Sequence, residues 1–197
     1  MNQPPRECVI LIDIDGTIVP NLVDFEKLRY EIRKMIGIDH PLRPLGESLE
    51  SLPLKEDLKR TAWELIEKEE LASIERLRVE NVQNNVSSII SAVNEKHKVV
   101  LVTIRSSRTT IPLLKKIGLK NYITEVVTRD QYKTRKMQLK YLMDKFNDST
   151  IVFIADTLYD RDVANELGLR FIKVESYRDL PRVLENALNM CEANVRS

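Results

Sequence analysis

Three short apolar runs constrain the fold of this chain more than any other feature. Residues 9–12, 99–104 and 151–155 are rich in Val and Ile, do not alternate with polar residues, and are followed at once by polar or acidic ones. Runs of this kind are typical of central strands buried on both faces of a parallel sheet. They predict the middle of an α/β fold, with weaker strands at residues 125–128 and 170–174.

Helical patterns lie between the predicted strands, at residues 86–94, 110–117, 137–146 and 160–167, and another lies near the end at 181–190. Each places apolar residues three or four positions apart, which gives a helix one buried face. Alternation of strands and helices predicts a Rossmann-like, three-layer α/β core with a parallel sheet.

Residues 21–78 interrupt this rhythm. They contain no convincing buried strand and predict helices at 23–36 and 54–77, joined by a proline-containing loop at 40–53. The expected organisation is an α/β core made of residues 1–20 and 79–197, with a helical insertion at 21–78 directly after the first strand.

Composition excludes several classes of protein. With 5 glycines, the chain has neither a dinucleotide-binding G-x-G-x-x-G turn nor a phosphate-binding P-loop. A net charge of +1 predicts no strong general attraction to nucleic acid or to anionic membranes. We therefore expect neither as a partner, and the sequence does not indicate an oligomeric state.

The two cysteines and two histidines are too far apart in sequence to form a zinc-site spacing, and a disulfide framework is not expected. This cysteine usage suggests a reducing compartment. The first apolar run is too short for the core of a signal peptide, and no run has the roughly 18 to 20 apolar residues of a membrane span. The resulting prediction is a soluble cytoplasmic protein.

Polar side chains follow each of the three main strands. They are Asp13 and Asp15 after the first, Thr103 after the second, and Asp156 and Asp160 after the third. Ligands in such sheets bind beyond the carboxyl ends of the strands, so these groups should converge at one edge. Clustered carboxylates repel one another unless a cation is present, and an all-oxygen set favours Mg²⁺. Such a site suits phosphoryl transfer.

These residues resemble the motifs of the haloacid dehalogenase-like hydrolases. Residues 9–17, VILIDIDGT, are similar to the first motif, D-x-D-G-T. Residues 99–103 are similar to the second, an apolar strand that ends in Thr or Ser, and residues 155–160, ADTLYD, to the fourth, G-D-x-x-x-D. The insertion resembles the small cap that many members carry after the first strand. The third motif supplies a lysine before a helix.

The resemblance implies a role for each motif residue. Asp13 would be the nucleophile that forms an aspartyl-phosphate, and Asp15 the general acid and then the base. Thr103 would hydrogen-bond a phosphoryl oxygen. Mg²⁺ would be held by Asp156, the Asp13 side chain and the Asp15 backbone carbonyl, with Asp160 acting through water or by orienting another group.

Substrate binding is expected from Gly16 and Thr17, in the turn that leads toward the cap, and from Arg105. Arg105 and Arg108 follow the second strand and could steer an anionic substrate. The cap would close over the site and contact the leaving group.

The motif lysine has two candidates, Lys136 and Lys133. Lys136 is favoured because it stands at the start of the helix predicted at 137–146 and follows Arg135, although the proline common after the family's lysine is missing. Lys133 has a spacing to Asp156 closer to that of some members. A second departure is Ala155, where the family usually has glycine.

The expected function is a Mg²⁺-dependent phosphatase that acts on a small phosphorylated metabolite through an aspartyl-phosphate. By resemblance alone, the substrate would be phosphoglycolate-like or a nucleoside monophosphate. The alternatives are a phosphomutase of the same family and a non-catalytic binding module that retains the fold. Asp15 favours phosphate chemistry, since members that attack carbon lack an aspartate there.

Overall fold

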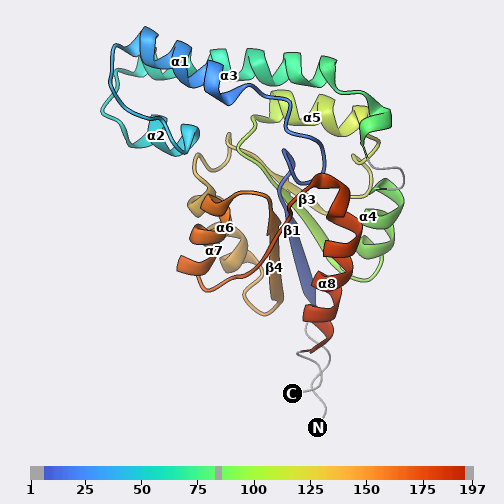
Figure 1. Cartoon of the computed structure of the whole chain (residues 1–197). Helices are drawn as coiled ribbons and strands as arrows, with labels where there is room; N and C mark the ends of the chain where they lie inside the picture. The colour runs from blue at the N-terminus through green and yellow to red at the C-terminus, as the bar shows by residue number, and fades with distance from the viewer. Residues whose placement is uncertain (1–6, 83–85, 194–197) are drawn as a thin grey trace.

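The computed structural model describes residues 7–82 and 86–193 and has a five-stranded parallel sheet at its centre (Figure 1). The strand order β3-β2-β1-β4-β5 puts the first strand in the middle, between the two other strongly apolar runs. The α/β fold and all five expected strands are confirmed. The strands are β1 Cys8–Ile12, β2 Lys98–Val102, β3 Glu125–Val127, β4 Thr150–Ala155 and β5 Arg170–Lys173.

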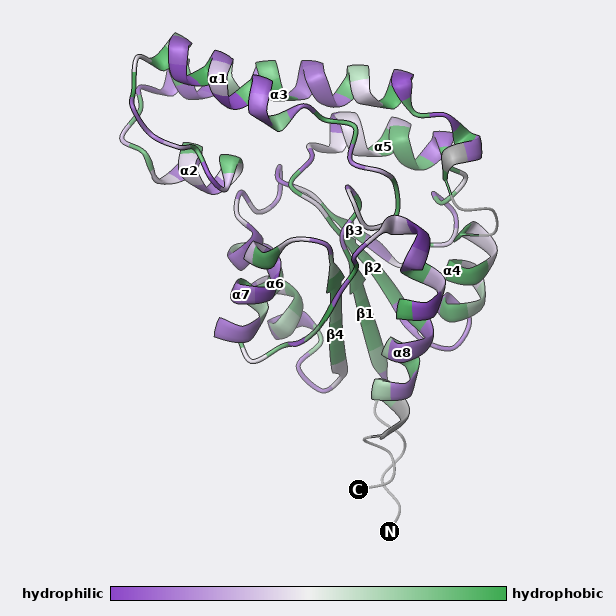
Figure 2. Cartoon of the chain, in the orientation of Figure 1, coloured by the Kyte–Doolittle hydropathy of each residue, from purple (hydrophilic) through white to green (hydrophobic). Residues whose placement is uncertain are grey.

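Two helical layers cover the sheet because successive side chains of a strand point to opposite faces. On β1, Ile10 and Ile12 pack with α4 (Val86–Asn94) and α8 (Leu180–Ala193). Val9 and Leu11 pack on the other face with α6 (Arg135–Lys145) and α7 (Leu158–Glu166). The central strands β1, β2 and β4 are the most apolar part of the sheet (Figure 2). This double burial explains their continuous Val and Ile runs.

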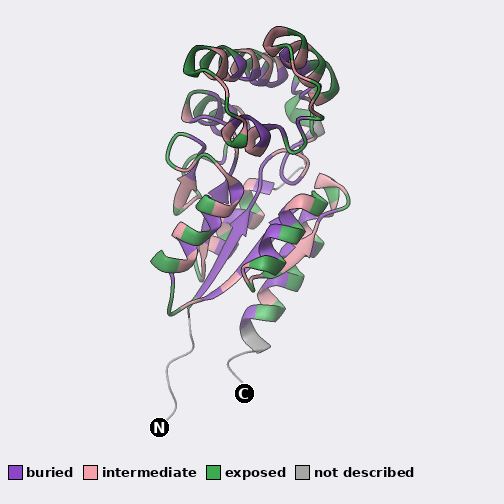
Figure 3. Cartoon of the chain, turned by 90° about the vertical axis from the view of Figure 1, so that its left-hand side faces the viewer, coloured by how far each residue is buried: buried purple, intermediate pink, exposed green. Residues whose placement is uncertain are grey.

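Three helices form a layer over the carboxyl ends of the strands (Figure 3): α1 Phe25–Ile36, α2 Leu45–Ser51 and α3 Glu56–Arg76. They have a hydrophobic cluster of their own, which includes Leu28, Ile32 and Leu49. Helix α3 also packs on α5 (Ser107–Lys116), which follows β2. We call α1–α3 and their connections the cap; the exact chain division at residues 20/21 and 78/79 stays a prediction.

Helix α2 was not expected, because the prolines and glycine of residues 40–53 predict a loop. Pro44 stands immediately before the helix and Pro53 after it, so neither interrupts its hydrogen bonds. Leu45 and Leu49 are buried one turn apart and hold α2 against the cap cluster. Packing therefore outweighs the weak local preference of a seven-residue segment.

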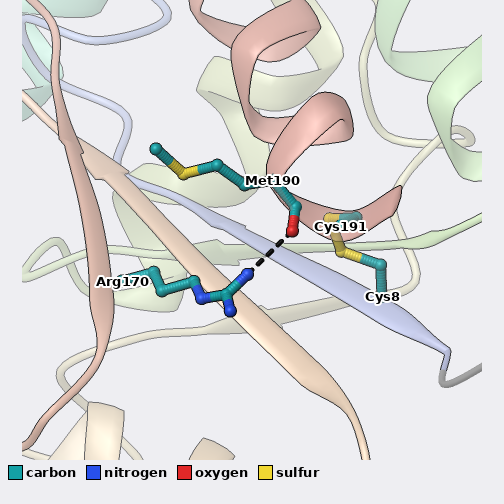
Figure 4. Close-up of a disulfide and its surroundings, with 4 residues drawn as sticks. All are labelled: Cys8, Arg170, Met190 and Cys191. Carbon is teal, nitrogen blue, oxygen red and sulfur yellow. Dashed lines mark hydrogen bonds between the residues drawn. A yellow bond between two sulfur atoms is a disulfide. The ribbon is translucent and has the colours of Figure 1, made fainter. Parts of the chain in front are cut away.

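The expectation that the cysteines stay unpaired is wrong. Cys8, at the start of β1, and Cys191, in α8, form a disulfide with a Cα–Cα distance of 5.7 Å (Figure 4). Beside it, Arg170 donates a hydrogen bond to the carbonyl oxygen of Met190 at 2.7 Å. A separation of 183 residues hides a pair that only the packing of α8 beside β1 brings together. The argument for a reducing compartment therefore fails, and a cytoplasmic location stays a prediction.

The longest helix, α3, has 21 residues but carries charged side chains along its length. Across residues 7–82 and 86–193, no helix is both long and apolar enough to span a membrane.

Candidate active site

The end of β1 places two carboxylates at the centre of the sheet's carboxyl edge. Asp13 is 6% exposed, and its backbone N–H donates to the carbonyl of Ile154 at 2.9 Å, which extends the pairing with β4 by one residue. The chain then turns back, because the Gly16 N–H donates to the Val19 carbonyl at 2.8 Å. Asp15 lies in this turn beneath the cap.

Gly16 brings the first and fourth motifs into close contact. Its φ of +80° is in the left-handed region, which a side chain disfavours. A Cβ atom at this position would lie 2.1 Å from Oδ2 of Asp156. The glycine of D-x-D-G-T is therefore required twice, for the turn and for the approach of the Asp156 carboxylate.

We expect Gly16→Ala to lower both stability and activity, because the new methyl group must displace Asp156. Gly37→Ala is the matched control: Gly37 has a φ of +73°, and a methyl group there would meet no atom of the described residues within 4 Å. It should show only the backbone cost, about 1 kcal/mol. Urea denaturation should show a larger loss for Gly16→Ala. Equal losses, with activity retained in both variants, would show that the contact with Asp156 is unimportant.

Thr103 follows β2 and is 1% exposed. Its Oγ1 accepts a hydrogen bond from the Arg105 N–H at 3.1 Å, and its carbonyl accepts one from Nε2 of Gln138 at 2.7 Å. Gln138 is fully buried and was not singled out from the sequence. It fixes the backbone of the second motif against α6.

The cation beside Asp13 is Arg135. Its Nη2 donates to Oδ1 of Asp13 at 2.5 Å, its Nε to Oδ1 of Asp160 at 2.7 Å, and its Nη1 to the Val102 carbonyl at 2.8 Å. A planar guanidinium can serve several acceptors at once, which an ammonium group cannot do with the same geometry. Arg135 therefore joins the ends of β1, β2 and α7 through one side chain.

Neither candidate lysine reaches the carboxylates. Lys136 is 41% exposed and pairs with Glu166 on α7, and Lys133 is 62% exposed and pairs with Glu50 on α2 at 3.5 Å. The preference for Lys136 does not match the structure. The buried stripe of α6 contains Arg135, Leu139 and Leu142, spaced by four and three residues. That spacing was the sequence signal for Arg135, since neighbouring helical residues point about 100° apart.

Asp160 is a buried carboxylate whose two oxygens are both engaged. Its Oδ1 accepts from Arg135, its Oδ2 accepts from the Thr157 hydroxyl, and the residue is 4% exposed. This fits the expectation that Asp160 orients another group. It leaves Asp13 and Asp156 as the side chains best placed to share a cation.

Burial dominates the electrostatics of these acids. It raises the pKa of the Asp13 carboxyl well above its ordinary value, and Arg135 offsets part of that rise. Burial, followed by the charge of Asp160, raises the pKa of Asp156 to about 6. For Arg135, burial alone would lower the pKa, but Asp160 and Asp13 together raise it. The guanidinium is therefore permanently charged.

These features fit a divalent cation. Oδ1 of Asp156 is buried without a hydrogen-bond partner among the described residues. The four carboxylates Asp13, Asp15, Asp156 and Asp160 face two paired guanidiniums, Arg105 and Arg135, which leaves two negative charges. The described residues contain no cluster of three or more His, Cys, Asp or Glu side chains arranged for a metal. A site of two carboxylates and a backbone carbonyl, with waters, is what Mg²⁺ accepts.

We expect the stability of the metal-free protein to fall as pH rises from about 4 to 6, because Asp156 keeps its proton in the folded state longer than in the unfolded state. Asp156→Asn removes this ionisation. In EDTA, the variant should melt at a higher temperature than the wild type at pH 8, with the advantage shrinking toward pH 4. Asp162→Asn, at an exposed neighbouring position, is the control and should melt like the wild type at both pH values. A pH-independent difference for Asp156→Asn would contradict the argument.

Asp15 and Arg105 form a two-pronged ion pair. Nε of Arg105 donates to Oδ2 of Asp15 at 2.6 Å and Nη2 donates to Oδ1 at 2.7 Å. Nη2 also donates to Oγ of Ser73 on α3 at 3.0 Å, and the arginine is 4% exposed. The expectation that Arg105 binds substrate therefore needs revision, because its guanidinium is committed to Asp15 and to the cap.

Gly16 and Thr17 do not line the cavity of about 540 Å³ that lies beneath the cap, whereas Asp15 and Arg105 do. Thr17 is fully buried. Both support the turn after β1, so direct substrate contact from them is not supported.

We expect Arg105→Gln to destabilise the protein by roughly 2–4 kcal/mol, because it leaves Asp15 without its cation and removes a tie to α3. Arg108→Gln is the control: that side chain is 77% exposed, and its Nη1 lies 3.8 Å from Glu67. An exposed pair of this kind contributes at most about 1 kcal/mol. Chemical denaturation measures both variants. Similar small losses would show that the buried pair adds nothing to stability.

Further contacts attach the cap to the core. Glu70 of α3 is buried, accepts a hydrogen bond from Thr109 at 2.6 Å and lies 3.3 Å from Arg129. Burial raises the pKa of Glu70, partly offset by Arg129. From α2, Glu47 accepts a hydrogen bond from the Arg135 N–H at 2.8 Å, at the start of α6. The cap is thus seated on the residues that surround Asp13.

A cavity of about 540 Å³ lies between the cap and the strand ends. Its wall includes all five expected strand-end residues, together with Arg135. The cap contributes apolar side chains as well as charged ones. The volume is within the range of small-molecule sites. The five residues on the cavity wall are Asp13, Asp15, Thr103, Asp156 and Asp160.

A parallel sheet with carboxylates at its carboxyl edge, beneath a helical cap, defines an α/β enzyme with an acidic active-site cavity. A family model described as haloacid dehalogenase-like hydrolase matches residues 10–174. The chain belongs to the haloacid dehalogenase-like hydrolases, as its motifs predicted, and is an enzyme of that family. No curated protein matches it.

Solved structures share the fold at low sequence identity. A hydrolase from Streptococcus pneumoniae TIGR4 is 21% identical, with 92% of this chain and 100% of that chain covered and a TM-score of 0.56. A HAD-superfamily hydrolase of subfamily IA from Geobacter sulfurreducens PCA is 15% identical, with coverage of 87% and 96% and a TM-score of 0.56. A predicted phosphoglycolate phosphatase from Haemophilus somnus is 15% identical, with coverage of 89% and 97% and a TM-score of 0.59.

Proposed function

We propose that this enzyme hydrolyses the phosphate monoester of a small metabolite, with Asp13 as the nucleophile and Mg²⁺ as the cofactor. The observation that carries the proposal is the position of Asp13, a buried carboxylate on the wall of the cavity, oriented by Arg135 and close to Asp15, Thr103 and Asp156. When bound by Asp13, Asp156 and the Asp15 carbonyl, Mg²⁺ would neutralise charge on the phosphoryl oxygens.

The reaction divides into two displacements at phosphorus. A carboxylate oxygen of Asp13 attacks in line, the bond to the leaving oxygen breaks, and that oxygen takes a proton from Asp15. Water then attacks the aspartyl-phosphate, gives its proton to Asp15, and frees phosphate and Asp13. Thr103 would donate a hydrogen bond to a phosphoryl oxygen in both steps.

Two arginines have defined tasks in this scheme. Arg135 orients the Asp13 carboxylate and offsets part of its negative charge while the carboxylate oxygen attacks phosphorus. Arg105 occupies both oxygens of Asp15. One oxygen must be released before Asp15 can donate a proton, so we infer that Asp15 shifts relative to Arg105 and α3 during the cycle.

The test is hydrolysis of an aryl phosphate by the wild-type protein, with Mg²⁺ and with EDTA. The expected result is Mg²⁺-dependent release of inorganic phosphate, together with a hydroxylamine-sensitive phosphoryl adduct on the peptide that contains Asp13. A folded, Mg²⁺-binding protein that is inert across a broad panel of phosphate esters would refute the proposal. Transfer of the phosphoryl group to a sugar hydroxyl, without release of phosphate, would identify a phosphomutase instead.

A further inference from the structure

The cap end of the cavity contains an excess of positive charge. Five arginines line the cavity, and three of them are neutralised by carboxylates of their own. Arg105 pairs with Asp15, Arg129 with Glu67 and Glu70, and Arg135 with Asp13 and Asp160. The other two, Arg29 and Arg43, share one carboxylate, that of Glu26.

Arg29 is held with part of its hydrogen-bonding capacity unused. Its side chain is 13% exposed, and its Nη2 donates to Oε1 of Glu26 at 2.6 Å. Its Nε is buried and has no hydrogen-bond partner among the described residues. A buried N–H without a partner costs free energy, so a guanidinium that lines the cavity in this way gains if it turns a donor toward a ligand acceptor. Arg43 adds a second, more exposed cation that shares the same glutamate.

The acidic residues Glu47 and Asp162 of the same wall have contacts elsewhere. Glu47 accepts a hydrogen bond from the backbone N–H of Arg135 at 2.8 Å, and Asp162 pairs with Arg161, which is not among the lining residues. Glu26 itself is 67% exposed and is not among the lining residues. The carboxylate that pairs with Arg29 and Arg43 is therefore not one of those that line the cavity, and an anionic group that enters the cavity can approach both arginines.

Apolar side chains of the cap also line the cavity. The Arg29 guanidinium carbon lies over the Phe25 ring, 6.0 Å from the ring centroid. The cavity wall also contains Leu45, Trp63 and Ile66. Trp63 is held from two sides, by Glu50 through its Nε1 at 3.1 Å and by the Arg129 guanidinium at 4.2 Å from its ring centroid. These side chains favour a ligand with an apolar or flat group next to them.

We propose that Arg29 and Arg43 form a subsite for a second anionic group, carried by an apolar leaving group of the phosphomonoester substrate. The proposal rests on the proposed phosphatase function and narrows its substrate class. A nucleoside monophosphate has no second anion, and a two-carbon phosphoglycolate has no apolar body, so both should be poor substrates. The preferred substrate has a phosphate ester at one end and a carboxylate or similar group at the other.

The test compares 4-carboxyphenyl phosphate with its methyl ester, which keeps the shape and removes the second charge. The wild type should favour the acid by about ten- to a hundredfold in kcat/KM, the range of one charged hydrogen bond. Arg29→Gln should bring the acid-to-ester ratio close to one. Arg43→Gln, an exposed position, should lower the ratio less and provides a second variant if Arg29→Gln does not fold. Arg33→Gln, one turn away on α1 and outside the cavity, should leave the ratio unchanged.

Binding separates this proposal from the catalytic one. Calorimetry on the Asp13→Asn protein measures the affinity for both probes without turnover. Suppose that the wild type hydrolyses neither probe, but the acid binds at least tenfold more tightly than the ester and Arg29→Gln removes this difference. The subsite then stands and the proposed phosphatase function fails. If the acid and the ester bind and react alike, or if the preference survives Arg29→Gln, the subsite is refuted.

Discussion

Asp13→Asn is expected to reduce kcat for an aryl phosphate by at least about a thousandfold, because an amide cannot form the aspartyl-phosphate. The same change should not weaken the fold. Burial raises the pKa of Asp13, so ionising this carboxyl costs the native state stability as pH rises. Arg135 also keeps Asp160 as its partner in the variant. We expect the metal-free variant at pH 8 to melt at or above the wild-type temperature.

Steady-state kinetics and thermal melts on the same samples measure both effects. Asp144→Asn, an exposed carboxylate on α6, is the control and should change neither activity nor stability. Loss of activity together with a large drop in melting temperature would assign Asp13 a structural role. Retained activity would remove it from the mechanism.

Arg135→Met is expected to lower the free energy of unfolding by about 3–5 kcal/mol, the usual cost of removing one partner from a buried ion pair. The side chains of Asp13 and Asp160 are 9% and 5% exposed and would lose their shared cation. Activity should fall as well, because Asp13 loses the group that orients it. Arg135→Lys should give intermediate losses of stability and activity, since one ammonium group cannot donate to all the acceptors of the planar guanidinium.

Urea denaturation at pH 7 measures the stability loss, and a double variant tests its cause. Adding Asp13→Asn to Arg135→Met removes one of the two unpaired carboxylates, so the double variant should be more stable than Arg135→Met alone. Lys136→Met is the matched control, since its exposed pair with Glu166 should contribute about 0.5 kcal/mol or less. If Lys136→Met abolished activity and Arg135→Met did not, the role assigned to Arg135 would be wrong.

The positions of Lys136 and Arg135 show a limit of prediction from sequence. The segment was recognised, but the residue favoured in it, Lys136, pairs with Glu166, while its neighbour Arg135 contacts Asp13. A helix start offers three consecutive side chains in directions about 100° apart, and the types of the residues alone do not say which of them points toward the strand ends. The choice is made by the packing of Leu139 and Leu142, which turns Arg135 toward the strand ends.

Local sequence determined the parallel sheet, the helices on its faces, the cap's position in the chain and the five strand-end residues, because each depends on a period or a short motif. Tertiary structure decided what no local pattern contains. It paired Cys8 with Cys191, engaged Arg105 with Asp15, and left Nε of Arg29 buried without a hydrogen-bond partner among the described residues. These contacts join segments far apart in the chain, so their energies depend on distance and burial, which a sequence of residue types does not encode.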